Sequence, residues 1–380
     1  MKIKNLDVSD FLANYWQKKP LVIRQAFSRA EWLTPDELAG LACEEDVESR
    51  IILQQEGVWS VEHGPFSESR FATLPQSHWT LLVQGVDQWL PEVASVLASF
   101  AFLPSWRLDD IMVSYAPTGG TVSQHYDFFD VFLIQGEGSR TWQVGEICGS
   151  DSEYLPNTPV RILKEFNAQL EVTMLPGDIL YIPAKYSHYG VSVEDSLTYS
   201  VGFRAPSIRD VVDGVCTSAL EHLQEDFRYQ DSLDTLSAQR GQIPEQAIEQ
   251  IQAMLLSAIN DKELLGSWLG QYVSERKYPE QIEAGLESED VMQGIHNEEW
   301  VQKHPASRFA YRFGSAELSS LFVDGQEYKA DTQVAEYLAN SYELDSAELY
   351  KLVQESGSQH LLAELILQGA LIFEDDYVEA

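Results

Sequence analysis

Residues 124–134 read Gln124-His125-Tyr126-Asp127-Phe128-Phe129-Asp130-Val131-Phe132-Leu133-Ile134, which places a histidine and a carboxylate two positions apart before an apolar, β-branched and aromatic run. Successive side chains of a β-strand alternate between its faces, so we expect His125 and Asp127 to point to the same side. An imidazole and a carboxylate held side by side are two of the three ligands of a non-haem Fe(II) facial triad. The segment therefore predicts a strand that carries two metal ligands.

A candidate for the missing imidazole is His188, which ends the run Leu175-Pro176-Gly177-Asp178-Ile179-Leu180-Tyr181-Ile182-Pro183-Ala184-Lys185-Tyr186-Ser187-His188. In this run a Pro-Gly-Asp turn leads into a short apolar strand, and a proline ends that strand. The two histidines are about sixty residues apart, so they meet only if the chain folds back on itself, as it does in a β-barrel. We expect both segments to meet at one metal site.

The identity of the metal follows from the ligand set. A His-x-Asp pair alone is weak evidence in a chain with 8 His and 60 Asp+Glu, because most lone histidines fill a core or a surface. The loop signal Pro117-Thr118-Gly119-Gly120 before the predicted strand, together with His188, strengthens the interpretation. Zinc accepts the same ligand types, but two imidazoles and one carboxylate that leave open positions favour Fe(II).

The charge of the chain is strongly unbalanced. Its 380 residues include 60 Asp+Glu and only 25 Lys+Arg, a formal net charge of −35. A field of this sign repels nucleic acid and anionic membranes and attracts basic partners. Two readings stay open: a basic macromolecular substrate, or a solubility and habitat effect unrelated to function.

Cysteine usage and the N-terminus indicate the compartment. Cys43, Cys148 and Cys216 are odd in number and lack metal-ligand spacing, which suits a reducing environment. The chain opens without the apolar core of a signal peptide and contains no apolar run of transmembrane length. We expect a cytoplasmic protein without membrane contact.

The order of the patterns predicts an α+β fold class. Residues 1–206 are predicted to form a double-stranded β-helix domain, a jelly roll of the cupin type, because residues from about 106 to 204 consist of short strands with turn signals between them. A helix is expected over 91–100, just before the jelly roll. Residues 207–290 change to a helical period and are assigned to a helical module that packs on itself or on a twin chain, with a polar, acidic linker over 274–297.

Residues 291–380 are predicted to form a winged-helix-like domain. Helices at about 331–341, 346–355 and 358–368 are flanked by strands, as in that fold. Winged helices often bind DNA, but the third helix contains no Lys or Arg, and contact with phosphates requires cations. We therefore predict no direct binding of nucleic acid.

An iron site of this kind requires a co-substrate that chelates the metal and supplies electrons to O2, and 2-oxoglutarate does both. Its far carboxylate needs a buried cation, and Arg140 at the start of an apolar strand is the natural candidate, since a guanidinium holds a carboxylate in bidentate fashion. The alternative for Arg140 is a salt bridge at a strand end. Ser114, on the strand before the glycine loop, and Thr198, on a closing strand, are candidates to line the same ligand pocket.

These residues together resemble the JmjC-domain 2-oxoglutarate oxygenases, and most closely the bacterial ribosomal oxygenases that hydroxylate an arginine of a large-subunit ribosomal protein. The resemblance runs through most of residues 1–206 and more loosely through the remainder. It rests on His125-x-Asp127, Arg140, the Leu-Pro-Gly-Asp-x-Leu-Tyr-Ile-Pro run with His188, Ser-Val-Gly-Phe-Arg-Ala-Pro at 200–206, and the opening Tyr-Trp-Gln-Lys-Lys-Pro-Leu-Val-Ile at 15–23.

The resemblance implies a function and an assembly. It implies Fe(II) on His125, Asp127 and His188, with 2-oxoglutarate on Arg140 and Ser114 and O2 as the second co-substrate. It also implies a basic ribosomal protein as substrate and a homodimer formed through the helical module. The chain departs from the family pattern at Thr198-Tyr199-Ser200, where an Asn-Tyr-Ser is usual.

Three alternatives stay open at this point. The same iron chemistry acts on histidine in related ribosomal oxygenases, and a non-ribosomal protein is a further target class. A degenerate cupin that binds a basic partner without catalysis is the third. For an arginine substrate the pocket needs acidic or carbonyl oxygens, and Asp130 is one candidate, with a purely structural role as its alternative.

Overall fold

The computed structural model of the protein describes residues 2–223, 226–231, 239–278 and 287–373. The chain divides into two compact units, Met1–Ala205 and Pro206–Ala380. Within the described ranges, none of the helices combines the length and the apolar character that crossing a bilayer requires.

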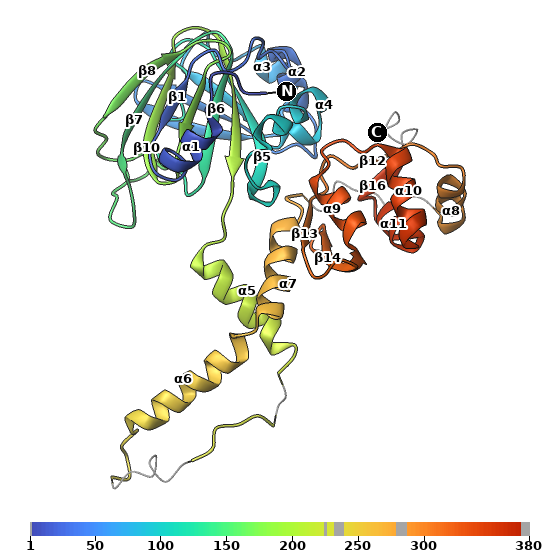
Figure 1. Cartoon of the computed structure of the whole chain (residues 1–380). Helices are drawn as coiled ribbons and strands as arrows, with labels where there is room; N and C mark the ends of the chain where they lie inside the picture. Colours follow the sequence, from blue (N-terminus) through green and yellow to red (C-terminus); the bar gives the residue numbers. More distant parts are fainter. Residues whose placement is uncertain (1, 224–225, 232–238, 279–286, 374–380) are drawn as a thin grey trace. The chain divides into compact units, whose positions relative to one another are not determined.

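The first unit is built on a large antiparallel sheet (Figure 1). Four of its strands come from the region before residue 84 and extend the sheet on both sides of the central strands. In spatial order the strands are β1 (Leu21–Ile23), β9 (Ile179–Ile182), β6 (Asp130–Glu137), β11 (Ser196–Phe203), β5 (Leu108–Ala116), β4 (Trp79–Val83), β2 (Ser49–Gln55) and β3 (Val58–His63).

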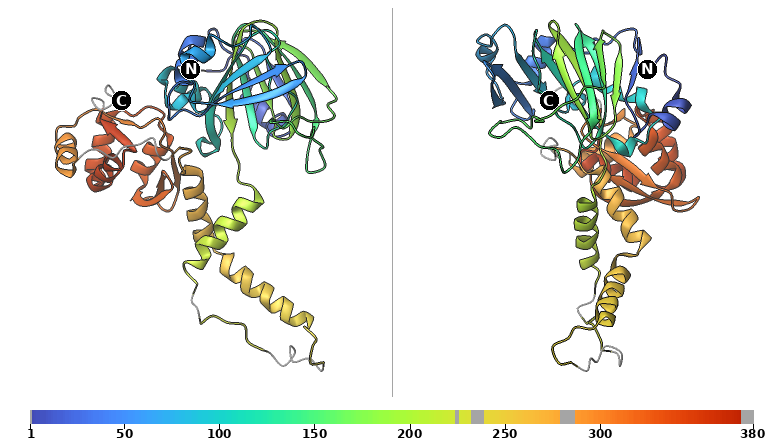
Figure 2. Two further views of the ribbon diagram at one scale, coloured as in Figure 1. Left: turned by 180° about the vertical axis from the view of Figure 1, so that it is seen from behind. Right: turned by 90° about the vertical axis from the view of Figure 1, so that its left-hand side faces the viewer.

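A smaller antiparallel sheet lies face to face with the large one (Figure 2). It contains β10 (Tyr186–Ser192), β7 (Arg140–Ile147) and β8 (Leu170–Met174), in that order. Apolar side chains of β6 and β9 from the large sheet and of β7 and β8 from the small one form the core between them. Seven strands, β5 to β11, are thus divided between two facing sheets, and the predicted double-stranded β-helix of an α+β protein is confirmed.

Strand β6 shows why the large sheet is buried on both faces. Val131 and Leu133 point into the core between the sheets, whereas Phe132 and Ile134 join a second core on the opposite face. This alternation follows from the two-residue period of a strand. A strand buried on both faces reads as a continuous apolar run, which is the pattern of residues 131–134.

The second core is covered by the N-terminal segment. Thr34 caps α2 in a capping box with Glu37, as Ser/Thr-x-x-Glu patterns predict.

The prediction of one helix over 91–100 is wrong, because α4 ends at Ala94 and a 3-10 turn follows. The Ser95 hydroxyl donates to the carbonyl of Glu92 and competes with the helical hydrogen bond. The elements here are α1 (Val8–Asn14), α2 (Pro35–Leu41), α3 (Glu68–Phe71), α4 (Pro91–Ala94) and the 3-10 turns Val86–Gln88, Leu97–Phe100 and Ser105–Arg107.

In its described residues, the second unit begins with the helices α5, α6 and α7 and ends in a domain with its own core. Its two small sheets have the orders β12-β16 and β13-β14-β15. The elements are α5 (Ile208–Leu220), α6 (Glu245–Ile259), α7 (Lys262–Ser274), α8 (Ser288–His296), β12 (Val301–Lys303), β13 (Phe309–Arg312), β14 (Leu318–Val323), β15 (Gln326–Asp331), α9 (Thr332–Asn340), α10 (Ser346–Ser356), α11 (Gln359–Leu367) and β16 (Leu371–Phe373).

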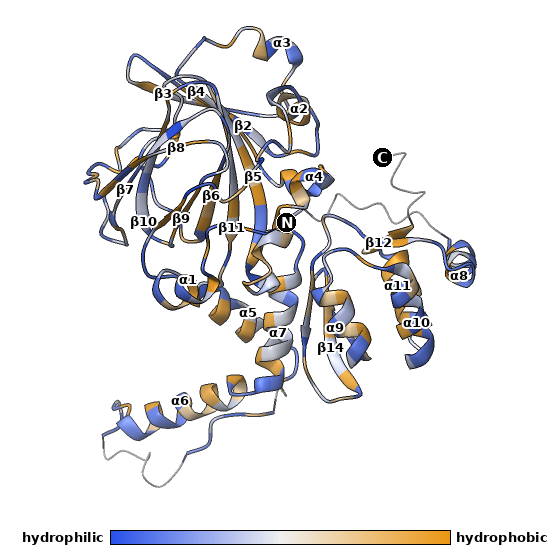
Figure 3. Cartoon of the chain, turned by 45° about the horizontal axis from the view of Figure 1, so that its top comes forward, coloured by the Kyte–Doolittle hydropathy of each residue, from blue (hydrophilic) through white to orange (hydrophobic). Residues whose placement is uncertain are grey.

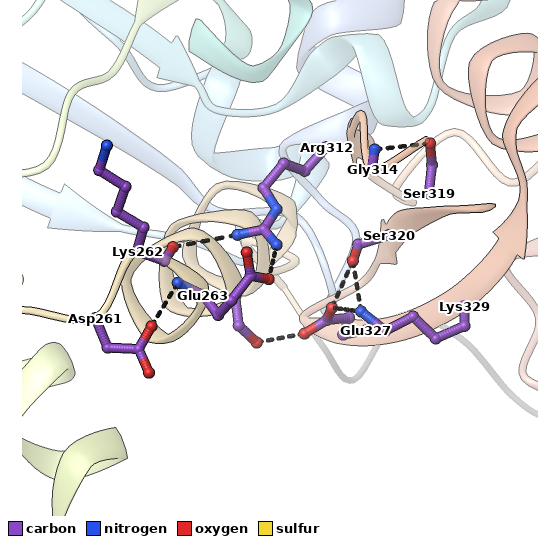
Figure 4. A network of polar contacts seen from close by, with 10 residues as sticks. Asp261, Lys262, Glu263, Arg312, Gly314, Ser319, Ser320, Glu327 and Lys329 are labelled. Atoms are coloured by element: carbon purple, nitrogen blue, oxygen red, sulfur yellow. Dashed lines mark hydrogen bonds and ion pairs between the residues drawn. The ribbon is translucent and has the colours of Figure 1, made fainter. Parts of the chain in front are cut away.

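Helix α7 packs on the sheet β13-β14-β15 through a polar network (Figure 4). Arg312 donates to the carbonyl of Lys262 at 3.2 Å and pairs with the carboxylate of Glu263. Burial alone would raise the pKa of Glu327, but hydrogen bonds from Lys329, Ser267 and Ser320 outweigh it and lower that pKa to about 2. The Glu327 carboxylate therefore stays charged at neutral pH, and its hydrogen bond from Ser267 ties the helix to the sheet.

The segment 274–297, predicted as a linker, contains a helix in its described part. Val291 and Ile295 of α8 are buried in the core of the C-terminal domain, so the prediction is wrong from residue 288 onward. The acidic residues that suggested a linker, Glu289 and Asp290, occupy the first turn of the helix, where carboxylates favour its dipole. Residues 279–286 of the expected linker lie outside the described residues.

Asp130 at the start of β6 is a buried carboxylate that joins three segments. It accepts hydrogen bonds from the Tyr181 hydroxyl at 2.7 Å and the Gln17 amide at 3.2 Å, and it pairs with Arg107 at 3.4 Å. Burial and the nearby Asp130 charge raise the pKa of Tyr181, so its hydroxyl remains a donor. The Asp130 carboxylate is therefore bound by groups of the protein itself. This favours a structural role for Asp130 over a contact with substrate.

We expect Tyr181→Phe to lower the free energy of unfolding by about 1–3 kcal/mol, because it deprives the buried Asp130 of its shortest hydrogen bond. Urea denaturation of the full chain, followed by fluorescence, measures the change. Tyr189→Phe is the matched control, since this half-buried ring packs beside Phe166, and we expect a change within about 0.5 kcal/mol. Equal stability of the two variants would contradict the structural role of Asp130.

Candidate metal and co-substrate site

The two histidines meet at the junction of the two sheets. His125 and His188 form an isolated antiparallel bridge, in which each backbone N–H donates to the other carbonyl, at 3.0 and 2.8 Å. Their ring centroids are 4.3 Å apart. The structure therefore brings together the two segments that the sequence analysis expected to meet.

The expected strand for His125 and Asp127 is only partly present. Strand β6 begins at Asp130, and the chain bends at Phe128 and Phe129, so the pair lies in an extended segment before the strand. Beyond the bridge to His188, the Asp127 carbonyl accepts from the backbone of Lys185 at 2.7 Å, which keeps the segment extended. His188 itself lies inside β10, not after a strand as expected.

Asp127 completes a cluster of three ligand atoms. Its Oδ2 lies 3.6 Å from Nε2 of His188 and 3.9 Å from Nε2 of His125, and one ligand atom of each residue lies within 4.8 Å of the others. In the described part of the chain this is the one group of three or more His, Cys, Asp or Glu residues with such spacing. Two nitrogens and one oxygen on one side of a small space match the donor set of a facial triad.

Hydrogen bonds orient both imidazoles for metal binding. The Nδ1 of His125 lies 2.9 Å from the Ser123 carbonyl, and the Nδ1 of His188 lies 3.1 Å from the Tyr186 carbonyl. A carbonyl only accepts, so Nδ1 carries the proton and the Nε2 lone pair faces Asp127. Burial, reinforced by His125, lowers the pKa of His188 to about 4, which keeps this ring neutral at neutral pH.

The residues next to the ligands, Gln124 and Tyr126, contact the connection between β7 and β8. Gln124 exchanges two hydrogen bonds with the backbone of Leu163, at 2.9 and 3.0 Å. Tyr126 stacks on Tyr154 with a centroid distance of 6.3 Å. Odd-numbered residues of this segment thus carry the candidate ligands, while even-numbered residues anchor the segment. The sequence patterns did not predict these anchoring contacts, because Leu163 and Tyr154 are distant in sequence.

Arg140 is a buried cation without an acidic partner among the described residues. It is 2% exposed, its Nη1 donates to the Ser114 hydroxyl at 3.2 Å, and its Nε has no hydrogen-bond partner. Burial lowers the pKa of Arg140 to about 10, so it remains charged at neutral pH. An uncompensated buried charge is costly, and an anionic ligand with several oxygens would compensate it.

Thr198 lies beside this cation through strand pairing. It is the register partner of Ser114 in the β11–β5 pair, and the Ser114 hydroxyl donates to its carbonyl at 3.5 Å. The Thr198 hydroxyl donates at 3.4 Å to the side chain of Gln135, which is 1% exposed on β6. Arg140, Ser114 and Thr198 are therefore neighbours, and Gln135 is a member of this polar group that the sequence analysis missed.

The donor set fits a metal ion with a chelating dicarboxylate. Three ligand atoms leave positions free on the ion, and Arg140 offers unpartnered donor capacity for the far end of the chelate. Both Nε2 atoms face Asp127, and burial keeps His188 neutral, which is the state that binds a metal. The residues present thus fit Fe(II) and 2-oxoglutarate.

Comparison with known families finds two matches. The JmjC domain matches residues 95–211, and the ROXA-like winged helix matches residues 257–372. Both parts of the predicted fold class, the JmjC jelly roll and the C-terminal winged helix, are confirmed.

Comparison with individual proteins extends the similarity to nearly the whole chain. The ribosomal protein uL16 3-hydroxylase of Escherichia coli is 32% identical over 374 residues, covering 97% of this chain and 98% of that protein. A probable ribosomal oxygenase of Haemophilus influenzae is 32% identical over 382 residues, covering 96% and 94%. The solved structure of the Escherichia coli ribosomal oxygenase YcfD with cobalt and 2-oxoglutarate has a TM-score of 0.85 and 31% identity, covering 98% of this chain and 99% of that one.

We expect His188→Ala to lower the affinity for Co(II) at least about 100-fold, because one imidazole and one carboxylate cannot replace the three-ligand cluster. Titration of the purified protein, followed by the visible absorption of bound Co(II) and by calorimetry, measures the affinity.

His63→Ala is the control for the loss of an imidazole, since His63 lies exposed on β3. Its Co(II) affinity should stay within about twofold of the unsubstituted protein. Equal affinities of His188→Ala and His63→Ala would place the metal elsewhere.

Proposed function

This chain belongs to the JmjC-domain ribosomal oxygenases, and we propose that it hydroxylates an arginine side chain of a large-subunit ribosomal protein, the counterpart of uL16. It is a 2-oxoglutarate-dependent dioxygenase that uses Fe(II) and O2. The observation that carries the proposal is the cluster of His125, Asp127 and His188 beside the buried, uncompensated Arg140.

The roles of the site residues follow from their positions. His125 and His188 would bind the metal through Nε2 and Asp127 through Oδ2, while Arg140 and Ser114 would hold the far carboxylate of 2-oxoglutarate. Thr198 would support this end through Gln135. When bound, the iron centre supplies the oxidation that converts 2-oxoglutarate and O2 into succinate, CO2 and a hydroxyl group on a substrate carbon.

The protein's own contribution is orientation and exclusion of water. The Nδ1 hydrogen bonds fix both imidazole rings before the metal arrives, so little rearrangement is needed on binding. The co-substrate end is closed, since Arg140 and His188 are 2% and 3% exposed. The Asp127 side chain is 46% exposed, so a protein substrate reaches the site from its side.

Exposed aromatic residues beside Asp127 support an arginine substrate. Phe128 is 58% and Phe129 is 42% exposed, immediately after the metal-binding segment. A guanidinium group binds favourably over an aromatic face. The net charge of −35 adds attraction for a basic ribosomal protein. Both features favour a cationic target over a neutral one, while histidine and a non-ribosomal target are the alternatives that the experiment distinguishes.

We expect succinate to form when the protein, loaded with Fe(II) and 2-oxoglutarate without oxygen, is exposed to air with the organism's own uL16. Mass spectrometry of the product should place one added oxygen on an arginine. His188→Ala should form no hydroxylated product, because the metal cluster is broken.

The outcomes separate the alternatives. An added oxygen on histidine, or turnover only with a non-ribosomal protein, would contradict the arginine proposal and keep the chemistry. A metal-loaded protein that forms no succinate with any basic ribosomal protein would favour a non-catalytic binding role.

We also propose that the protein is a homodimer formed through its helical segment. Helix α6 has no buried residue in the single chain, although hydrophobic residues recur along it (Figure 3). Ile248, Ile251 and Leu255 have three-and-four spacing and are 52%, 53% and 55% exposed. On α5, Ile208 and Leu220 are 77% and 71% exposed. An apolar helix face of this kind is buried when a second copy covers it.

We expect the full chain to behave in solution as a particle of twice its 42.9 kDa mass, and the double variant Ile251→Glu/Leu255→Glu to behave as a monomer. Light scattering coupled to size-exclusion chromatography measures the mass. Gln252→Glu, at an exposed position of the same helix, adds charge without removing apolar surface and should remain dimeric. A monomeric unsubstituted chain would contradict the proposal.

A further inference from the structure

The Trp142 side chain is buried with an unsatisfied polar atom. It is 5% exposed on β7, and its indole Nε1 has no hydrogen-bond partner among the described residues. Buried indole N–H groups are nearly always hydrogen-bonded, so an orphan donor of this kind indicates a missing partner. Nε of Arg140, two residues earlier on the same strand face, lacks a partner in the same way.

Strand pairing places Trp142 between the metal cluster and Arg140. In the β10–β7 pair, His188 is opposite Val144, Gly190 is opposite Trp142 and Ser192 is opposite Arg140. At about 3.3 Å per residue, the register positions of His188 and Arg140 are separated by about 13 Å along the strand direction. An extended five-carbon dicarboxylate of about 6 Å, with a metal bond of about 2 Å and a hydrogen bond of about 3 Å, spans a similar distance. The ligand's path therefore passes Trp142.

Gly190 provides the space for the indole. A Cβ atom at this position would lie 2.7–2.8 Å from three carbons of the Trp142 ring, closer than real Cβ contacts. The ring centroid lies 5.9 Å from that of His188 and 5.0 Å from the Arg140 guanidinium carbon. The indole thus lies over Gly190 with the metal-binding histidine on one side and the buried cation on the other.

We propose that Trp142 is a co-substrate-binding residue, whose indole N–H donates a hydrogen bond to a carboxylate oxygen of 2-oxoglutarate and whose ring forms the pocket wall over Gly190. This assignment rests on the proposed function, because it requires 2-oxoglutarate between the metal ligands and Arg140. It explains why a tryptophan with an unpaired donor occupies a position where phenylalanine would fill the apolar core without that cost.

The test compares 2-oxoglutarate binding by Trp142→Phe and the unsubstituted full-length protein, both loaded with Co(II). We expect calorimetry to give a dissociation constant about tenfold higher for Trp142→Phe, because one hydrogen bond to a charged group is lost. The Co(II) affinity, measured separately, should stay within about twofold. Gly190→Ala, which displaces the ring while keeping the indole N–H, should weaken 2-oxoglutarate binding as well.

Intrinsic fluorescence supplies a second readout that a purely structural role would not change. 2-Oxoglutarate should alter the tryptophan emission of the Co(II)-loaded protein, and the change should disappear in Trp142→Phe but persist in Trp59→Phe, the control on β3. A Trp142→Phe protein that binds 2-oxoglutarate as tightly as the unsubstituted chain would overturn the assignment of Trp142 alone. An unsubstituted protein that binds Co(II) but no 2-oxoglutarate would overturn the proposed function and the assignment with it.

Discussion

The reciprocal backbone hydrogen bonds between His125 and His188 are the constraint on which the site depends. They join the segment before β6, in the large sheet, to β10 in the small sheet. With this bridge in place, strand periodicity determines which side chains face inward. On the large sheet, Val131 and Leu133 face the interior, and on the small sheet the β10–β7 register places His188, Trp142 and Arg140 in that order. A shift of one residue at the bridge would turn the ligands outward.

The charge of the site runs against that of the chain. A protein with a net charge of −35 keeps Arg140 buried and without an acidic partner among the described residues. Its pKa falls to about 10 through burial, yet that value is well above neutral pH, so the guanidinium remains charged. Removing such an ion from water costs several kcal/mol, and truncating its nearest contact, Ser114, would leave it worse solvated. The cost is offset when an anion binds, so the burial of this unpaired cation favours the binding of an anionic ligand.

Much of the site could be predicted from the sequence, because its main members sit in local patterns. The His-x-Asp pair precedes an apolar run, His188 follows the Pro-Gly-Asp turn, and Arg140 begins an apolar strand. The contacts of Gln124 and Tyr126 with the β7–β8 connection could not be predicted, since they depend on how a long loop returns to the sheet. The bend at Phe128 and Phe129 could not be predicted for another reason. Two consecutive aromatic residues are typical of a strand, and their exposure is known only from the structure.

The candidate site has a buried end and an exposed end, and these two ends suit two different tasks. Arg140, Trp142 and His188 are 2%, 5% and 3% exposed, whereas the Asp127 side chain and Phe128 are 46% and 58% exposed. The small, doubly charged co-substrate needs a closed, polar-lined end, because a guanidinium binds a carboxylate most strongly away from water. A folded protein cannot enter such an end, so its target side chain must approach over Asp127 and Phe128. On the proposed assignment, recognition of the co-substrate depends on strand register in the barrel, and the choice of target residue depends on the exposed segment beside the proposed metal ligands.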